Sequence, residues 1–226
     1  MVEPEVQGMQ AFSCSSLTKV GDQIQLTDTR DGKQYWVAKL PDGNCWMTQN
    51  LDLDLSTSKT FTPADTNIPS NWTPSTGTTT TISGYNSDTG KSYNPGDKYY
   101  GSTGSEHYHV GNYYQWSAAT AGYTGISQST RSICPKGWTL PSQSQFQALI
   151  NSGLSGSNFM DAPYYLLRGG NLNNSSLPNA GSRGYYWSST PDGSSDAYGL
   201  YFGSGSVYTT FSDRYRGQSV RCVAAG

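Results

Sequence analysis

The sequence predicts an α+β fold that is rich in loops, with short antiparallel strands and one clear helix over residues 142–151. Three observations support this prediction. Gly, Ser, Thr and Asn are abundant while Leu and Ala are scarce, which is typical of short strands joined by long turns. In several segments apolar residues recur at every second position, as they do in half-buried strands. A single segment combines the apolar spacing and the capping residues of an amphipathic helix.

Length and charge limit the classes of function. A chain of 226 residues suits one large domain or two small ones and can bury a sizeable core. Its net charge of -2, with 13% charged residues, favours neither nucleic acid nor a membrane surface as partner. Only 34% of residues are hydrophobic, so the 17 Tyr and six Trp must fill much of the core. The expected aromatic core consists of Trp36, Trp46, Trp116, Trp138 and Trp187.

The four cysteines predict two disulfides in an extracytoplasmic protein. No Cys-x-x-Cys pair occurs and no His stands at a zinc-ligand offset, so a zinc site is not expected. Four cysteines allow three pairings, and four free buried thiols are the alternative. The pairings that we expect are Cys134 with Cys222 and Cys14 with Cys45.

Residues 1–10 are expected to form a loose tail, followed by a single domain over residues 11–226. No apolar run is long enough to span a membrane, and the first residues lack the apolar segment of a signal peptide. Met1 to Gln7 are compatible with a cut point after a removed export or anchor segment, so that any membrane attachment would be through that removed anchor.

Strand patterns occur at residues 24–26 and 34–40, and a further apolar run follows at residues 45–47. The Pro-Asp-Gly turn that begins at Pro41 predicts a hairpin between the last two. Residues 56–105 are rich in Ser, Thr, Gly and Asn and predict a long insertion. This insertion is either a mobile loop or an Ω-like excursion, and in the second case three aromatic residues would hold it: Trp72, Tyr85 and Tyr93.

The helix over residues 142–151 is predicted by its first turn. Ser142 is a favourable N-cap, and Gln145 stands three residues later as its partner in a capping box. Gly153 follows the last apolar position and ends the helix. Its apolar face consists of Phe146, Leu149 and Ile150.

Residues 185–222 predict a ligand-binding segment. Leu200 and Phe202 alternate with small residues and tyrosines, so one face of a strand is buried while the other faces solvent. Tyrosine is frequent in antibody binding sites because it buries a large area at low entropic cost. Strand alternation nominates as outward-facing Gly199, Tyr201, Gly203, Ser206, Tyr208 and Thr210.

Further residues extend this candidate site. A turn is expected at Phe211, Ser212 and Asp213, with Arg216 nearby and with Asp192 and Asp196 at the rim. Tyr and Arg anchors carry most of the energy in many interfaces. The residues expected to dominate affinity are Tyr201, Tyr208 and Arg216, above a buried set of Trp187, Leu200, Phe202, Val207 and Val220.

The composition of this segment suggests a mutational history. From Ser188 to Gly217 the chain has no Lys, Glu, Gln, Met, Trp, His or Asn, whereas Ser, Gly, Tyr, Thr and Asp abound. Substitution of the adenines in an Asn codon can yield Tyr, Ser, Asp, Gly, Thr, Phe or Arg, among other residues, and never yields Lys, Glu, Gln, Met or Trp. The segment is therefore consistent with Asn codons altered at their adenines. The alternative is an exposed Gly/Ser/Tyr-rich hairpin without such a history.

Five motifs occur in the order Thr29-Arg-Asp-Gly-Lys-Gln-Tyr35, Cys45-Trp-Met-Thr-Gln-Asn-Leu51, Tyr114-Gln-Trp-Ser-Ala-Ala119, Cys134-Pro-Lys-Gly-Trp-Thr-Leu-Pro141 and Tyr186-Trp-Ser-Ser-Thr190. Together they resemble a bacterial family, the Fibrobacter succinogenes major paralogous domain. The resemblance covers roughly residues 22–222, except for the insertion. It implies a C-type-lectin-like fold and an extracytoplasmic protein that is secreted or anchored at the cell surface.

The C-terminal segment also resembles the variable proteins of diversity-generating retroelements, in which a reverse transcriptase copies a template with errors at adenines. This resemblance implies a diversified receptor. Its partner would be an unknown protein or glycan on another cell or on a phage surface. The alternatives are a carbohydrate-binding lectin of fixed specificity and a structural module of the cell surface.

Chemical functions are weakly supported, and we expect no enzyme, metal or cofactor. The fold family resembles formylglycine-generating enzymes, which need copper-binding cysteines near the C-terminus, but only Cys222 stands there. His107 and His109 share a strand face, although two surface histidines are the simpler interpretation. Asp52 and Asp54 provide too few oxygen ligands for Ca²⁺. The sequence also lacks the Glu-Pro-Asn and Trp-Asn-Asp motifs of calcium-dependent lectins.

Overall fold

The computed structural model describes residues 7–55, 59–74, 110–174, 176–203 and 205–226. Two short 3₁₀ helices, η1 (Met9–Ala11) and η2 (Cys14–Ser16), precede the strands β1 (Gln23–Thr27), β2 (Gln34–Lys39) and β3 (Cys45–Met47). The helices α1 (Trp116–Ala119) and α2 (Gln143–Asn151) follow. The strands β4 (Gly184–Asp192), β5 (Asp196–Gly203), β6 (Ser206–Asp213) and β7 (Val223–Ala224) complete the chain. These elements confirm the predicted α+β class.

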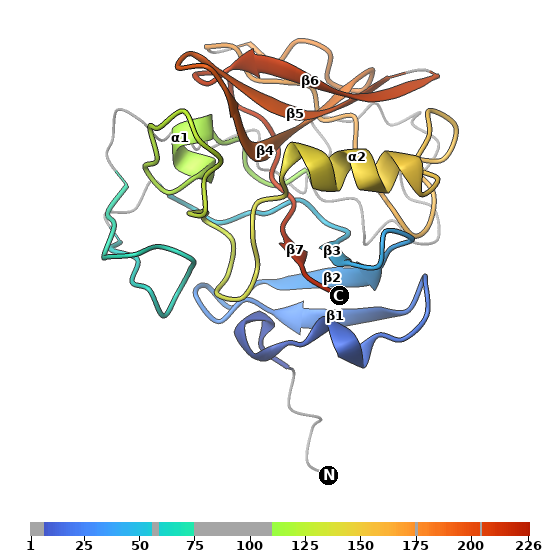
Figure 1. The fold of residues 1–226 in the computed structure, drawn as a ribbon, viewed down its shortest axis with the longest axis horizontal. Helices are drawn as coiled ribbons and strands as arrows, with labels where there is room; N and C mark the ends of the chain where they lie inside the picture. The colour runs from blue at the N-terminus through green and yellow to red at the C-terminus, as the bar shows by residue number, and fades with distance from the viewer. Residues whose placement is uncertain (1–6, 56–58, 75–109, 175, 204) are drawn as a thin grey trace.

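Two antiparallel sheets form the scaffold. One has the strand order β1-β2-β3-β7 and the other β4-β5-β6. In Figure 1 the second sheet lies at the top, with α2 directly beneath it and the first sheet at the bottom. Side chains from both sheets and from α2 share one apolar cluster, in which the Trp46 and Phe146 ring centroids are 5.5 Å apart. The helix therefore lies between the two sheets and supports the inner face of β4-β5-β6.

The predicted helix is present as α2, with the predicted cap. The Ser142 hydroxyl accepts a hydrogen bond from the Gln145 amide (3.1 Å), and the Gln145 side chain accepts one from the Ser142 amide (2.9 Å). Phe146 and Leu149 are buried, while Ile150 is half-buried against the same cluster. Local capping and apolar spacing thus predict the position of this helix, and its packing in the core stabilises it.

The hairpin predicted around Pro41 is formed by β2 and β3, which pair antiparallel. Within β2, however, alternation places Tyr35 and Val37 inward, so that Trp36 is only half-buried and does not belong to the core as predicted. The other four predicted tryptophans are buried. Val207, also predicted as buried, is partly exposed and packs against the cluster around α2.

Both predicted disulfides are present, between Cys14 and Cys45 and between Cys134 and Cys222. All four cysteines are buried and none is free. The first bond ties the N-terminal segment to β3, and the second ties residue 134 to the residue before β7. Two disulfides suggest an oxidising, extracytoplasmic environment.

The N-terminal boundary differs from the prediction. Residues 7–10 do not form a loose tail, because Met9 is buried and its carbonyl accepts a hydrogen bond of 2.9 Å from the Trp138 indole. The side-chain amide of Gln10 donates to the Asp28 carboxylate at 3.0 Å. These contacts anchor the start of the described chain to the core.

Part of the predicted insertion is also packed. Phe61 is only 1% exposed, and its ring lies 6.0 Å from that of Trp72. The Thr66 hydroxyl donates to the backbone carbonyl of Ser132 at 2.5 Å. Residues 59–74 therefore belong to the domain. Four residues on which other expectations rested lie outside the described residues: Tyr85, Tyr93, His107 and His109.

Candidate functional site

Three tyrosines form a row across the sheet β4-β5-β6. The antiparallel register pairs Tyr185 with Tyr201 and Tyr201 with Tyr208, so all three side chains lie on the same face. The Tyr185 and Tyr201 rings meet edge to face at 5.2 Å, and those of Tyr201 and Tyr208 are 4.7 Å apart. Such aromatic pairs contribute about 0.5–1.5 kcal/mol beyond area burial. This tyrosine row is half-exposed at its β6 end, where Tyr208 is 47% exposed.

An open cavity of about 440 Å³ lies beside the tyrosine row. The Arg183 guanidinium carbon is 5.9 Å from the centre of the Tyr201 ring, a geometry that permits a cation–π interaction. We call this hollow the Arg183 cavity. Its lining residues are Asn179, Ser182, Arg183, Tyr201, Gly203, Ser206 and Tyr208.

The Arg183 cavity is positively charged. A hydrogen bond with Tyr185 and the nearby Tyr201 raise the pKa of Arg183, so its side chain stays a cation. Removal from water and the neighbouring Tyr201 raise the pKa of Tyr208, which keeps its hydroxyl protonated at neutral pH. None of the seven described lining residues is acidic. The cavity can therefore offer a guanidinium, neutral hydroxyl groups and aromatic faces to a ligand.

The structure brings together only part of the predicted site. Four of the predicted residues line the Arg183 cavity: Tyr201, Gly203, Ser206 and Tyr208. Thr210 and Ser212 lie on the same face of β6, further along the strand, because they alternate with the inner residues of that strand. Both are half-buried, so the candidate face continues along β6 beyond the cavity.

Gly199 does not face a ligand as predicted. It is buried, and a Cβ added there would lie 2.4 Å from the Tyr186 carbonyl oxygen and 3.3 Å from the Gln218 side chain. The neighbouring strand β4 approaches β5 so closely at this position that no side chain fits. Alternation identified the correct face, but it could not show this cross-strand contact.

The turn expected at residues 211–213 is also wrong, because these residues complete β6. The register pairs Phe211 with Tyr198, and their rings meet edge to face at 6.3 Å on the face opposite the tyrosine row. Phe211 is 58% exposed there. The chain turns at residues 214–216 instead. Arg216 is half-buried and donates to the Asp213 carboxylate at 2.8 Å, so it does not reach the cavity lining.

The predicted acidic rim lies at the opposite end of the sheet from the cavity. Asp192 pairs with Asp196, and Asp196 pairs with Asp213, so the three aspartates stand in one row across the strands. The Asp196 carboxylate accepts a hydrogen bond of 2.8 Å from Ser195. In the part of the chain that the structure describes, no group of three His, Cys, Asp or Glu side chains is arranged to hold a metal ion.

Sequence reasoning missed three of the seven lining residues of the cavity, Asn179, Ser182 and Arg183, which come from the loop before β4. It also missed Tyr185 of the tyrosine row, which lies in β4 itself. Tyr185 was predictable, since period-two alternation extends back through β4, but Tyr186 and Trp187 follow it and hide the pattern. The position of Arg183 depends on backbone hydrogen bonds to distant residues, such as that from the Gly170 amide to the Arg183 carbonyl (2.8 Å).

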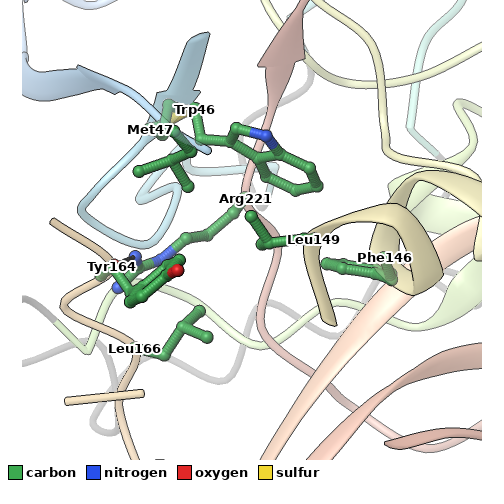
Figure 2. Close-up of a pocket in the computed structure, with 8 residues that line it drawn as sticks. Trp46, Met47, Phe146, Leu149, Tyr164, Leu166 and Arg221 are labelled. Carbon is green, nitrogen blue, oxygen red and sulfur yellow. Dashed lines mark hydrogen bonds between the residues drawn. The ribbon is translucent and has the colours of Figure 1, made fainter. Parts of the chain in front are cut away.

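An interior cavity between β3, α2 and the segment at residues 164–166 is filled by side chains. Figure 2 shows Arg221 reaching between Trp46 and Tyr164, with Leu149 of α2 beside it. The remaining space is about 10 Å³, at the lower limit for a single water molecule. The Arg221 guanidinium donates to the backbone carbonyls of Tyr164 (2.6 Å) and Tyr165. This region therefore contributes to stability and leaves no room for a larger ligand.

The sequence model of one family, the Fibrobacter succinogenes major domain, matches residues 42–158, more than half of the chain. The chain belongs to this family. No curated protein and no solved structure matches the chain significantly. The residues of the Arg183 cavity all follow residue 158 and so lie outside the part that matches the family.

Residues in the family-matched range hold the candidate face in place. The side-chain amide oxygen Oδ1 of Asn50 accepts hydrogen bonds from the Tyr186 hydroxyl (2.8 Å) and from Nε of Arg221 (3.0 Å). The Trp187 indole donates to the Tyr114 carbonyl at 2.7 Å. These bonds connect β4 to the family domain through buried, satisfied polar groups. We call the buried residues of β4 and β5, with these partners, the frame.

Two further findings bear on the chemistry of the chain. Cys222 is bonded to Cys134 and is therefore not available as a thiolate ligand or nucleophile. Among the helices of the described residues, none has the length and apolar character needed to cross a membrane.

Proposed function

We propose that this protein is a diversified receptor, which displays variable side chains on a C-type-lectin-like scaffold and binds a ligand outside the cytoplasm. One observation carries the proposal. No exposed or half-buried residue of β5 or β6 is Lys, Glu, Gln, Met or Trp, the residues that adenine substitution in an Asn codon never yields. The exposed and half-buried residues are Asp196, Tyr198, Tyr201, Ser206, Val207, Tyr208, Thr209, Thr210, Phe211, Ser212 and Asp213.

The packing beneath this face suits repeated substitution. Leu200 and Phe202 are buried against α2 and the loop at residue 159, where the Phe159 and Phe202 rings are 4.4 Å apart. Substitution of an exposed residue typically changes the free energy of unfolding by no more than about 0.5 kcal/mol. A buried frame can thus stay constant while the exposed positions change. The tyrosine row would be the binding surface of this particular variant.

The proposed partner is a protein or glycan on another cell or on a phage surface. The two disulfides support a site outside the cytoplasm, either as a secreted protein or as one anchored at the cell surface. A lectin of fixed specificity would use the same face without sequence variation. A purely structural module would use no face at all, so the two alternatives differ from the proposal in measurable ways.

The DNA that flanks the gene tests the diversification directly. We expect a second, near-identical copy of the coding segment for residues 185–222 close to the gene, together with a reverse transcriptase gene. The two copies should differ almost only where the second copy has adenine. If no such copy exists in the surrounding sequence, the hypothesis of diversification is wrong. A lectin of fixed specificity or a structural module then becomes the better interpretation.

A display library tests the binding function. Five exposed or half-buried positions, Tyr201, Ser206, Tyr208, Thr210 and Ser212, are varied among Tyr, Ser, Asp, Gly and Thr, and the library is selected against a panel of proteins and glycans. We expect folded members that bind different targets. The control library varies Leu200 and Phe202, which are buried, and should contain few folded members. Selection that never enriches a binder from the first library would contradict the proposal.

A further inference from the structure

The Arg183 cavity has two halves of different origin. Tyr201, Gly203, Ser206 and Tyr208 lie between residues 188 and 217, the segment with the composition of altered Asn codons. Asn179, Ser182 and Arg183 precede that segment. If the proposed diversification acts on the first group, the second group is a constant part of every variant.

Backbone hydrogen bonds hold the constant half rigidly. The Arg183 amide donates to the Asn179 carbonyl (2.9 Å), and the Arg183 carbonyl accepts from the Gly170 amide (2.8 Å). The Asn179 side chain donates to the Tyr185 hydroxyl at 3.4 Å. Gly170 has a φ of +74°, and a Cβ there would lie 2.6 Å from the Ala180 amide nitrogen, so glycine is required for this close approach. The guanidinium therefore projects from a fixed loop into the cavity.

The charge of the lining selects an anionic group. Arg183 is the cation at this site, and the other six described lining residues are neutral. A planar guanidinium presents paired N–H donors that match the two oxygens of a carboxylate. Because Tyr201 lies under the guanidinium, its ring limits the side-chain orientations available and favours one direction of approach.

The rest of the lining favours a sugar over a peptide. Two serine hydroxyls, one amide and two tyrosine hydroxyls surround the cavity, and these groups both donate and accept hydrogen bonds. The tyrosine rings add apolar faces on which the C–H face of a sugar ring can rest. A volume of about 440 Å³ lies within the range of small-molecule sites. A helical peptide would instead use an apolar groove. Polar groups predominate in the described lining, which offers no such groove.

We infer that the Arg183 cavity binds a carboxylate-bearing sugar ring, a uronic acid, with Arg183 as the invariant partner of the carboxylate. This inference rests on the proposed function and deepens it. Variation at Tyr201, Gly203, Ser206 and Tyr208 would then change which acidic glycan is preferred, whereas the requirement for an acid would be common to all variants.

The test uses the full chain, with tetragalacturonic acid as the probe and its fully methyl-esterified form as the uncharged control ligand. Affinities are measured by calorimetry for the parent chain, for Arg183→Gln and for the control Lys136→Gln. Lys136 is an exposed cation in the turn after Cys134, away from the lining, so its variant removes one charge without touching the cavity. Arg183→Lys keeps the charge but not the fork of donors. Circular dichroism confirms that each variant is folded.

We expect the acid to bind the parent at least about ten-fold more tightly than the ester. Arg183→Gln should weaken the affinity for the acid about ten-fold and leave the affinity for the ester unchanged. The affinity of Arg183→Lys for the acid should lie between those of the parent and Arg183→Gln, and that of Lys136→Gln should equal that of the parent. Equal affinity for acid and ester, or acid binding that Arg183→Gln leaves unchanged, overturns the inference.

Two other outcomes also overturn it. Absence of any binding of tetragalacturonic acid to the folded parent removes the uronic acid as ligand. Binding of hexaglutamate that depends on Arg183, without binding of tetragalacturonic acid, points to an acidic peptide instead. Neither outcome affects the proposed diversification, which is judged separately by the template copy beside the gene.

Discussion

Gly199 and Gly203 occupy the same face of β5, four residues apart, but their surroundings differ. A Cβ at Gly199 would collide with the Tyr186 carbonyl oxygen at 2.4 Å, a backbone atom that cannot move aside. A Cβ at Gly203 would lie 3.3 Å from the Tyr201 hydroxyl and 3.6 Å from the Arg183 side chain, and both of these can shift. Gly199 therefore belongs to the frame, whereas Gly203 is the floor of the Arg183 cavity.

This difference predicts that the same substitution destabilises the protein at Gly199 and has little effect at Gly203. Gly199→Ala should lower the free energy of unfolding by about 1–3 kcal/mol, because overpacking displaces the backbone of β4. Gly203→Ala should change it by no more than about 0.5 kcal/mol. Urea unfolding of the two variants measures both values. Equal destabilisation by the two variants would contradict the placement of Gly199 in the frame.

A buried ion pair predicts how stability depends on pH. Burial opposes the ionisation of Asp28, but hydrogen bonds and charge from Arg30 outweigh it and lower the pKa of this carboxyl below its usual value of 3.8. Their closest atoms are 2.5 Å apart, and Arg30 also donates to the Ile133 carbonyl. A lowered folded pKa contributes stability that is complete above the unfolded pKa, about 4, and is lost as pH falls through the folded value.

The free energy of unfolding should therefore fall between about pH 5 and about pH 3. The double variant Asp28→Asn, Arg30→Gln removes both charges together, so that no unpaired buried charge remains. It should show a weaker decline over the same range. Identical acid dependence in the parent and the double variant would show that this pair does not contribute.

At the scale of elements, α2 supports the sheet that bears the candidate face, because it packs beneath β4, β5 and β6. Its N-terminus depends on the reciprocal hydrogen bonds of Ser142 and Gln145. Ser142→Ala should lower the free energy of unfolding by about 1 kcal/mol, whereas Gln147→Ala, exposed in mid-helix, should have little effect. Chemical denaturation of both variants measures the difference. Equal effects would mean that the cap contributes nothing.

The elements that the sequence predicts well are those with local causes. The capping box defines α2, and the Pro-Asp-Gly turn defines the β2–β3 hairpin. The errors arise where distant segments meet. The burial of Gly199 depends on the close approach of β4. The face on which Phe211 lies depends on the pairing with β5, which extends β6 to Asp213. Arg183 was missed because its loop is held by residues 170 and 179, which no local pattern connects to the tyrosine row.

At the scale of the whole molecule, two disulfides link the ends of the chain to the core. Cys134 and Cys222 are 88 residues apart, and Cys14 and Cys45 are 31 apart. In the chain-entropy model, closing the longer loop contributes about 4–5 kcal/mol and the shorter about 3–4 kcal/mol. Removal of the longer disulfide by paired Cys→Ala substitution should therefore be the more destabilising change. Thermal unfolding of the two paired Cys→Ala variants compares their melting temperatures. A lower melting temperature for the variant without the Cys14–Cys45 bond would contradict this account.

The whole account rests on a constant frame beneath a variable face. Sequencing of this gene from many members of its source population tests that claim most directly. We predict that amino-acid changes concentrate at Tyr201, Ser206, Tyr208, Thr210 and Ser212, at positions where a template has adenine. Codons for Gly199, Leu200, Phe202 and Arg183 should stay constant. Equal variation in the two sets of codons, or none in either, would contradict the account.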